Sequence, residues 1–147
     1  MAAGSQSRRT ALVTGLTGQD GSFLAELLLG SGYRVVGMIR GGSTAPLGCS
    51  EHLRGQVELV RGELLEPETL TAAVAELRPA ELYHLAAPSF VPDSWEQPAL
   101  TLQAIAGATA ALLEAVRAHS PDTRTFVAVS ATIFGAVRES PQRECTP

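Results

Sequence analysis

The chain has 147 residues with 45% hydrophobic and 18% charged content, a composition typical of a globular domain rather than of a disordered segment. Its formal net charge is −4 and its 11 basic residues are scattered, which argues against a nucleic-acid partner. Residues 1–9 contain no apolar core of a signal peptide, and no apolar run approaches membrane-spanning length, so we expect no membrane partner and a cytoplasmic location.

Two further counts constrain the chemistry. Cys49 and Cys145 lie far apart without metal-ligand spacing, so we expect two reduced thiols and no metal site. All 11 basic residues are arginine, and the sequence contains no lysine.

Apolar runs alternate with helix-like segments along the chain. We expect strands at 10–15, 34–40, within 57–64, 81–87 and 123–131, and helices at 22–32, 67–78 and 99–119. We expect loops at 41–50 and 88–98, the second because it carries three prolines, and an irregular tail at 134–147. Strands that alternate with helices and are apolar on both faces predict a doubly wound parallel sheet, a Rossmann-like α/β fold. A flexible stretch, 1–9, would precede one cofactor-binding domain, 10–147.

The stretch GLTGQDG at 15–21 joins the first expected strand to the first expected helix and has glycine at every third position. Glycines at such a turn let the backbone approach a phosphate closely, and the helix N-terminus adds a partial positive charge. The pattern therefore predicts a dinucleotide pyrophosphate site, with a plain tight turn as the alternative. The predicted site comprises Gly15, Thr17, Gly18, Gln19, Asp20 and Gly21.

The ends of the later strands add further candidates. Arg40 ends the second strand, where an acidic residue would favour NAD and an arginine favours the 2′-phosphate of NADP; a solvent-facing arginine is the alternative. Glu63, followed by Leu64, comes after the third strand and could accept a hydrogen bond from an adenine amino group. Small residues after the fourth strand would let the backbone approach a cofactor, although sheet–helix packing explains them equally well. These residues are Leu85, Ala86 and Ala87.

Together these stretches resemble the extended short-chain dehydrogenase/reductase family, and within it the GDP-mannose 4,6-dehydratases. The most specific matches are GLTGQDGS and SFVPDSWEQP, and the resemblance covers nearly the whole chain after Arg9. It covers only the N-terminal part of family members, which are about twice this length. The family would imply NADP as a hydride carrier, GDP-mannose as substrate, and a helix-packed dimer in full-length members. We favour a core role for the apolar face of 99–119 over a dimer role.

The resemblance also assigns active-site positions. Ser130 falls on the family's catalytic hydroxyl, with a strand-end hydroxyl that bonds backbone as the alternative. Thr132 falls on the glutamate that handles the proton at carbon 5 of the sugar, and a threonine hydroxyl cannot replace a carboxylate base. Ser89 follows the fourth strand and is the best substrate-binding candidate, whereas we expect Trp95 to pack and His84 to be a core or near-cofactor histidine.

Other departures leave the activity open. The family's base is the tyrosine of a Tyr-x-x-x-Lys motif, which a chain without lysine cannot contain. The family places this motif shortly after the equivalent of ECTP, so we expect the domain to be incomplete at its C-terminus. Pro88 and Ala136 replace a glutamine and a basic residue that are common in the family. We therefore expect no turnover by this chain alone. The alternatives are a non-catalytic NADP-binding module, a degenerate remnant, or a nucleotide-sugar epimerase or reductase.

Overall fold

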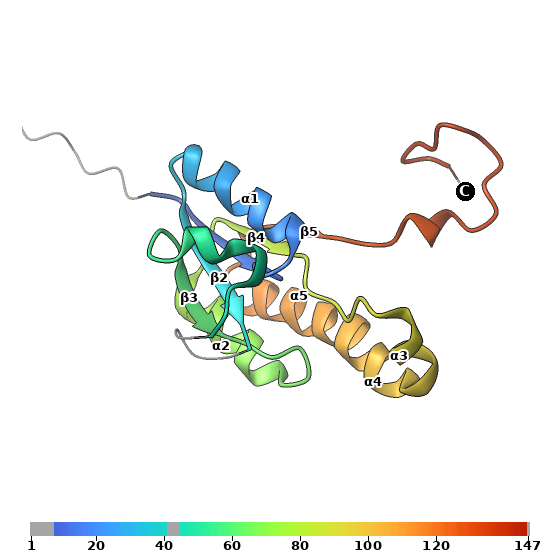
Figure 1. The fold of residues 1–147 in the computed structure, drawn as a ribbon, viewed down its shortest axis with the longest axis horizontal. Coiled ribbons are helices and arrows are strands. Elements are labelled where there is room, and N and C mark those ends of the chain that lie inside the picture. Colours follow the sequence, from blue (N-terminus) through green and yellow to red (C-terminus); the bar gives the residue numbers. More distant parts are fainter. Residues whose placement is uncertain (1–7, 41–44, 147) are drawn as a thin grey trace, which may run out of the picture.

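The structure is a computed structural model that describes residues 8–40 and 45–146. Its centre is one parallel sheet with the strand order β3-β2-β1-β4-β5 (Figure 1). The strands are β1 (Thr10–Thr14), β2 (Arg34–Ile39), β3 (Glu58–Arg61), β4 (Glu81–His84) and β5 (Arg124–Val127). The chain runs outward from β1 to β3 and then crosses to β4 on the other side of β1. This order confirms the predicted doubly wound sheet, with its switch point between β1 and β4.

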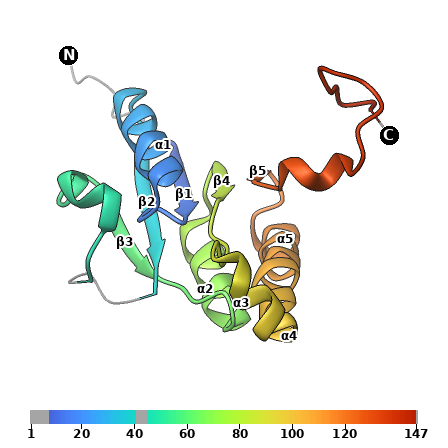
Figure 2. The same ribbon diagram turned by 45° about the vertical axis from the view of Figure 1, so that its right-hand side comes forward.

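Helices cover both faces of the sheet. Helix α1 (Gln19–Gly30) lies on one face, and α2 (Pro67–Leu77) and α5 (Ala108–His119) lie side by side on the other (Figure 2). Alternate strand residues supply the two cores: Val13 faces α1, whereas Leu12 faces α2 and α5. Because both faces of β1 are buried, apolar and polar residues do not alternate along it, as is usual for sheets covered on two sides.

The 88–98 segment is not the loop that we expected. It contains α3 (Val91–Glu96), and α4 (Pro98–Leu102) begins at its end. Prolines mark helix starts here. Pro92 is the second residue of α3 and Pro98 the first of α4, and in the first turn of a helix a missing N–H group costs no hydrogen bond. In the same way, the 41–50 stretch does not end as a loop, because a 3₁₀ helix, η1 (Gly48–Leu53), begins inside it.

The expected helix 99–119 is present, but it is interrupted. It runs through α4, a π-helical segment η2 (Gln103–Gly107) and α5. By length and composition, the 22-residue run Pro98–His119 would pass as a membrane-spanning helix, contrary to our reading of the sequence. Core helices pass the same test, and Leu112 and Val116 of α5 are buried against α2 and the sheet. We therefore assign α5 to the second helical layer of the fold.

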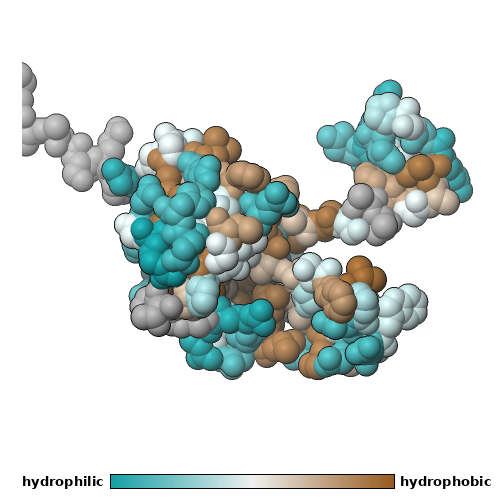
Figure 3. Space-filling model, viewed as in Figure 1, coloured by the Kyte–Doolittle hydropathy of each residue, from teal (hydrophilic) through white to brown (hydrophobic). Residues whose placement is uncertain are grey.

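Strand β5 ends earlier than the sequence predicts. It stops at Val127, and the chain then leaves the sheet through a short 3₁₀ helix, η3 (Ala131–Phe134), and an irregular tail (Figure 1). Apolar side chains remain exposed there, among them Phe126 at 55% and Val129 at 70%. Figure 3 shows hydrophobic residues at the surface beside the base of the tail and over α3 and α4.

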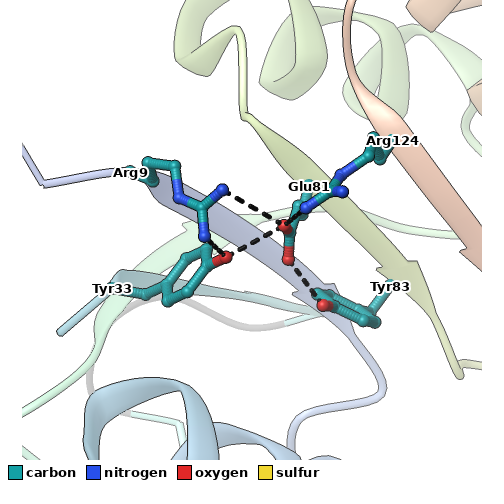
Figure 4. Close-up of polar contacts among 5 residues, drawn as sticks. All are labelled: Arg9, Tyr33, Glu81, Tyr83 and Arg124. Carbon is teal, nitrogen blue, oxygen red and sulfur yellow. Dashed lines mark hydrogen bonds and ion pairs between the residues drawn. The ribbon is translucent and has the colours of Figure 1, made fainter. Parts of the chain in front are cut away.

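A buried carboxylate ties the strands together at the amino edge of the sheet. Glu81, at the start of β4, accepts hydrogen bonds from the hydroxyls of Tyr83 (2.6 Å) and Tyr33 (2.9 Å) and from Arg124 (2.6 Å) (Figure 4). Arg9 lies 4.0 Å from the same carboxylate and stacks over the Tyr33 ring. The hydrogen bond from Tyr83 and those from Arg124 and Tyr33 lower the pKa of Glu81 to about 2, and the same carboxylate raises the pKa of Tyr83 to about 12.

The substitution Glu81→Gln should destabilise the fold by about 2 kcal/mol at pH 7, because the neutral amide loses the charge-assisted hydrogen bonds. The folded-state pKa of Glu81 lies below its ordinary value. Its contribution to the free energy of unfolding is therefore complete at pH values above the ordinary pKa and is lost as the pH falls toward 2. Urea unfolding of both proteins at pH 7 and pH 3 should therefore show a smaller difference at pH 3. An equal difference at both pH values, or an equal loss in the exposed control Glu76→Gln, would contradict this role.

Candidate functional site

The glycine loop joins β1 to α1 at the carboxyl edge of the sheet. Gly15 has a φ of +76°, a left-handed conformation that favours glycine, and its carbonyl accepts a hydrogen bond from the Gly18 amide at 3.1 Å. Gly18 is the N-cap of α1 and contributes no capping side chain. The loop thus turns the chain tightly from strand to helix, as the spacing predicts.

Two of the three glycines are required by backbone packing. A Cβ atom at Gly15 would lie 2.8 Å from the Ala86 nitrogen and 2.9 Å from the Leu85 carbonyl carbon. A Cβ atom at Gly21 would lie 2.2 Å from the Gly15 oxygen. Gly18 differs, because it is exposed and its Cβ would meet only the Gly15 oxygen at 3.4 Å. Gly15 and Gly21 therefore shape the loop, and Gly18 keeps its outer side open.

The N-terminus of α1 opens at this outer side. The first N–H groups of a helix have no intrahelical acceptor, and those of Gln19, Asp20 and Gly21 are not capped by a Gly18 side chain. Thr17, Gln19 and Asp20 are exposed beside them. Free N–H groups and the positive end of the helix dipole form the arrangement that binds phosphate in other proteins.

Thr14, which the sequence reasoning missed, anchors the neighbouring strand end. Its hydroxyl oxygen accepts hydrogen bonds from the amides of Leu85 (3.2 Å) and Ala86 (3.1 Å) and lies 2.7 Å from His84 Nδ1. Because two N–H groups occupy its lone pairs, the hydroxyl donates its own proton to His84, which is then neutral with its ring proton on Nε2. Burial lowers the pKa of His84, in agreement with this neutral form.

His84 is thus a buried histidine at the base of the site, as expected. The signal for Thr14 was present in the sequence, as a hydroxyl at the end of a buried strand, but its partners lie about 70 residues away. Leu85 and Ala86 are half-buried and Ala87 is exposed. The backbone of Leu85 and Ala86 lies against Gly15, and the approach to a cofactor that we expected of these residues stays a prediction.

The remaining cofactor candidates line the same edge. Arg40 follows the last residue of β2 and is exposed, with no hydrogen-bonding or ion-pair partner among the residues that the structure describes. Glu63 lies two residues after β3, half-buried, and its amide donates to the Thr69 hydroxyl at 2.9 Å. Leu64 packs against the core beneath α2 and α5. Carboxyl ends of parallel strands thus bring Arg40 and Glu63 to the side of the sheet where the glycine loop lies.

The predicted substrate residues are less organised. Ser89 is exposed between β4 and α3, and Ser130 is exposed three residues after β5. The side chain of Thr132 lies outside the described part of the structure. Its placement at the position of the family glutamate therefore stays a prediction. Trp95 is 83% exposed on α3, which contradicts the packing role that we expected within this chain.

Comparison with known proteins decides the family. Residues 12–147 match the family described as GDP-mannose 4,6 dehydratase. This chain belongs to that family. It is 39% identical to GDP-mannose 4,6 dehydratase 2 of Caenorhabditis elegans and 40% identical to the GDP-mannose 4,6-dehydratase of Yersinia enterocolitica, over 97% and 95% of its length. The chain spans 40% of the length of each of these relatives.

Solved structures with the same fold include sugar-nucleotide enzymes. UDP-glucose 4-epimerase from Bifidobacterium longum, in complex with NAD+ and UDP, is 26% identical with a TM-score of 0.78 over 94% of this chain and 42% of its own. An enzyme from Bordetella bronchiseptica in complex with NAD+ is 25% identical with a TM-score of 0.76 over 95% of this chain and 46% of its own. This chain and these two enzymes therefore share the Rossmann-like framework.

Gly21→Ala should destabilise the fold by about 2 kcal/mol or more, because its methyl group would overlap the Gly15 carbonyl. Gly30→Ala is the matched control at the other end of α1, where a Cβ atom meets nothing within 4 Å. Alanine there should be neutral or stabilising by up to about 1 kcal/mol. Urea unfolding of the two variants provides the comparison, and similar stabilities would contradict the packing argument.

Thr14→Val should cost about 1–3 kcal/mol of stability, because it removes the side-chain acceptor of the Ala86 amide and leaves the Leu85 amide only its 3.3 Å hydrogen bond to the Thr14 backbone carbonyl. Thr14→Ser retains the hydroxyl and should lose clearly less. Thermal and urea unfolding of the pair measure the difference. A valine variant as stable as the serine variant would show that these amides do not depend on the hydroxyl.

Proposed function

We propose that this chain is the dinucleotide-binding portion of a GDP-mannose 4,6-dehydratase-type enzyme, and that it binds NADP through residues 15–21. The observation that carries the proposal is the glycine loop. Its inner side is closed against β4 at Gly15, and its outer side leaves Gly18 and the N-terminus of α1 accessible. A pyrophosphate needs such a combination of room and unpaired N–H groups.

Arg40 supports NADP over NAD. The ribose of the adenosine lies near the end of the second strand in this fold, where a carboxylate would bind the 2′-hydroxyl and repel a 2′-phosphate. This chain has an exposed guanidinium there, and Arg40 has no partner among the described residues that would compete for it. Solved relatives of this fold carry NAD+, so the nicotinamide cofactor class is supported more broadly than the 2′-phosphate.

The dehydratase reaction gives the remaining residues their proposed roles. If bound at this site, NADP+ would supply the hydride acceptor for carbon 4 of GDP-mannose and, once reduced, the hydride donor for carbon 6. Ser130 would hydrogen-bond the sugar, and Ser89 would contact substrate beside β4. Neither serine can act as the titrating base that the proton transfers of this reaction need. The sequence has no lysine for a Tyr-x-x-x-Lys motif.

A second candidate function is therefore a non-catalytic NADP-binding module in the cytoplasm. It is favoured by the threonine at position 132, where the family resemblance places a glutamate. Purified chain incubated with GDP-mannose and NADP+ should leave the sugar nucleotide unchanged, as followed by chromatography. Formation of a 4-keto-6-deoxy product would refute the module and show that other residues supply the base.

Isothermal titration of the chain should detect NADP+ binding that is tighter than NAD+ binding. Arg40→Gln should weaken NADP+ by about 10- to 100-fold, the value of a lost charge-assisted hydrogen bond, and leave NAD+ affinity unchanged. Arg8→Gln is the control, because Arg8 precedes β1 at the opposite edge of the sheet. Absence of binding to either dinucleotide would refute the proposed function.

A further inference from the structure

The 3₁₀ helix η1 holds the glycine loop from outside. The Cys49 amide donates a hydrogen bond to the Thr17 carbonyl at 3.1 Å, and the Ser50 hydroxyl donates to the Leu16 carbonyl at 2.5 Å. In return, the Ser22 hydroxyl of α1 donates to the Cys49 carbonyl at 3.1 Å. Three hydrogen bonds thus join η1 to the loop residues between Gly15 and Gly18 and to the first turn of α1.

Close packing fixes this contact. Gly48 has a φ of +55°, and a Cβ atom on it would lie 2.6 Å from the Thr17 carbonyl oxygen. Leu47 and Leu53, on either side, are buried, so η1 is anchored to the core at both ends. His52 Nε2 and Glu26 Oε1, 2.6 Å apart, add a contact between the outer surfaces of η1 and α1.

Ser50 is the central member of this contact. It is completely buried, and its hydroxyl donates a hydrogen bond to the carbonyl of Leu16, which lies beyond the end of β1. Leu16 is itself completely buried, with its side chain over Gly37 of β2. The hydroxyl therefore fixes the direction of the peptide between Leu16 and Thr17, in the loop that leads to the N-terminus of α1.

We propose that Ser50 is a positioning residue for dinucleotide binding, which holds the 15–18 loop in the conformation that accepts the pyrophosphate. This inference rests on the proposed NADP function. Ser50 acts through the Leu16 carbonyl and does not touch the cofactor. Without its hydroxyl, the loop keeps its sequence and its glycines but samples other conformations, and the cofactor must select the competent one.

The test compares Ser50→Ala with Ser31→Ala, an exposed serine at the C-terminal end of α1. Titration calorimetry should show NADP+ affinity weakened about 5- to 30-fold in Ser50→Ala, the effect of one lost buried hydrogen bond, and unchanged in Ser31→Ala. Amide hydrogen exchange of the cofactor-free proteins should be faster in Ser50→Ala at residues 16–18 and 49, with the strands unchanged.

Each outcome decides the proposal. Wild-type binding with equal affinity in Ser50→Ala overturns the positioning role and leaves the NADP function intact. Weaker binding accompanied by faster exchange throughout the sheet also overturns it, because Ser50 would then stabilise the whole fold. If the wild-type chain binds neither NADP+ nor NAD+, the proposed function fails and this inference fails with it.

Discussion

The backbone at Gly15 lies so close to the backbone of Leu85 and Ala86 that no side chain fits between them. This contact joins the first strand to the fourth at the switch point of the sheet, where the crossover changes side. It also explains the neighbouring features of the site. Thr14 can reach the amides of Leu85 and Ala86 only because the two strand ends are in contact, and Gly21 must be small because α1 starts directly against Gly15.

The two edges of the sheet carry different kinds of polar groups. At the amino edge, Glu81 accepts hydrogen bonds from Tyr33, Tyr83 and Arg124 and forms an ion pair with Arg9. At the carboxyl edge, Arg40, Gln19 and Asp20 are exposed, and the N-terminus of α1 has no side-chain cap. A satisfied cluster stabilises a fold, whereas unsatisfied groups at the end of parallel strands are where such folds bind ligands. This contrast supports the carboxyl edge as the functional one.

Local patterns in the sequence were sufficient for most of the framework. The uninterrupted apolar runs predicted the five strands, and the glycine spacing predicted a turn that now has a physical reason at Gly15 and Gly21. The prolines at 92 and 98 led to a wrong loop prediction for 88–98. Proline interrupts a helix when it stands inside it, but it is favoured in the first turn of a new helix. The roles of Thr14 and Ser50 could not be predicted, since each depends on partners 34 to 72 residues away that only the fold brings together.

Strand β5 has a consequence for how this chain behaves in solution. Its outer edge has no strand beside it in the described sheet, and Phe126 on its face is largely exposed. An open edge that carries apolar side chains is a template for pairing with another chain, and few charges interrupt it, since Arg124 at its start is held by Glu81. The isolated chain will therefore self-associate as its concentration rises. Light scattering will detect this association, and its loss on dilution, before spectroscopy shows any change in the fold.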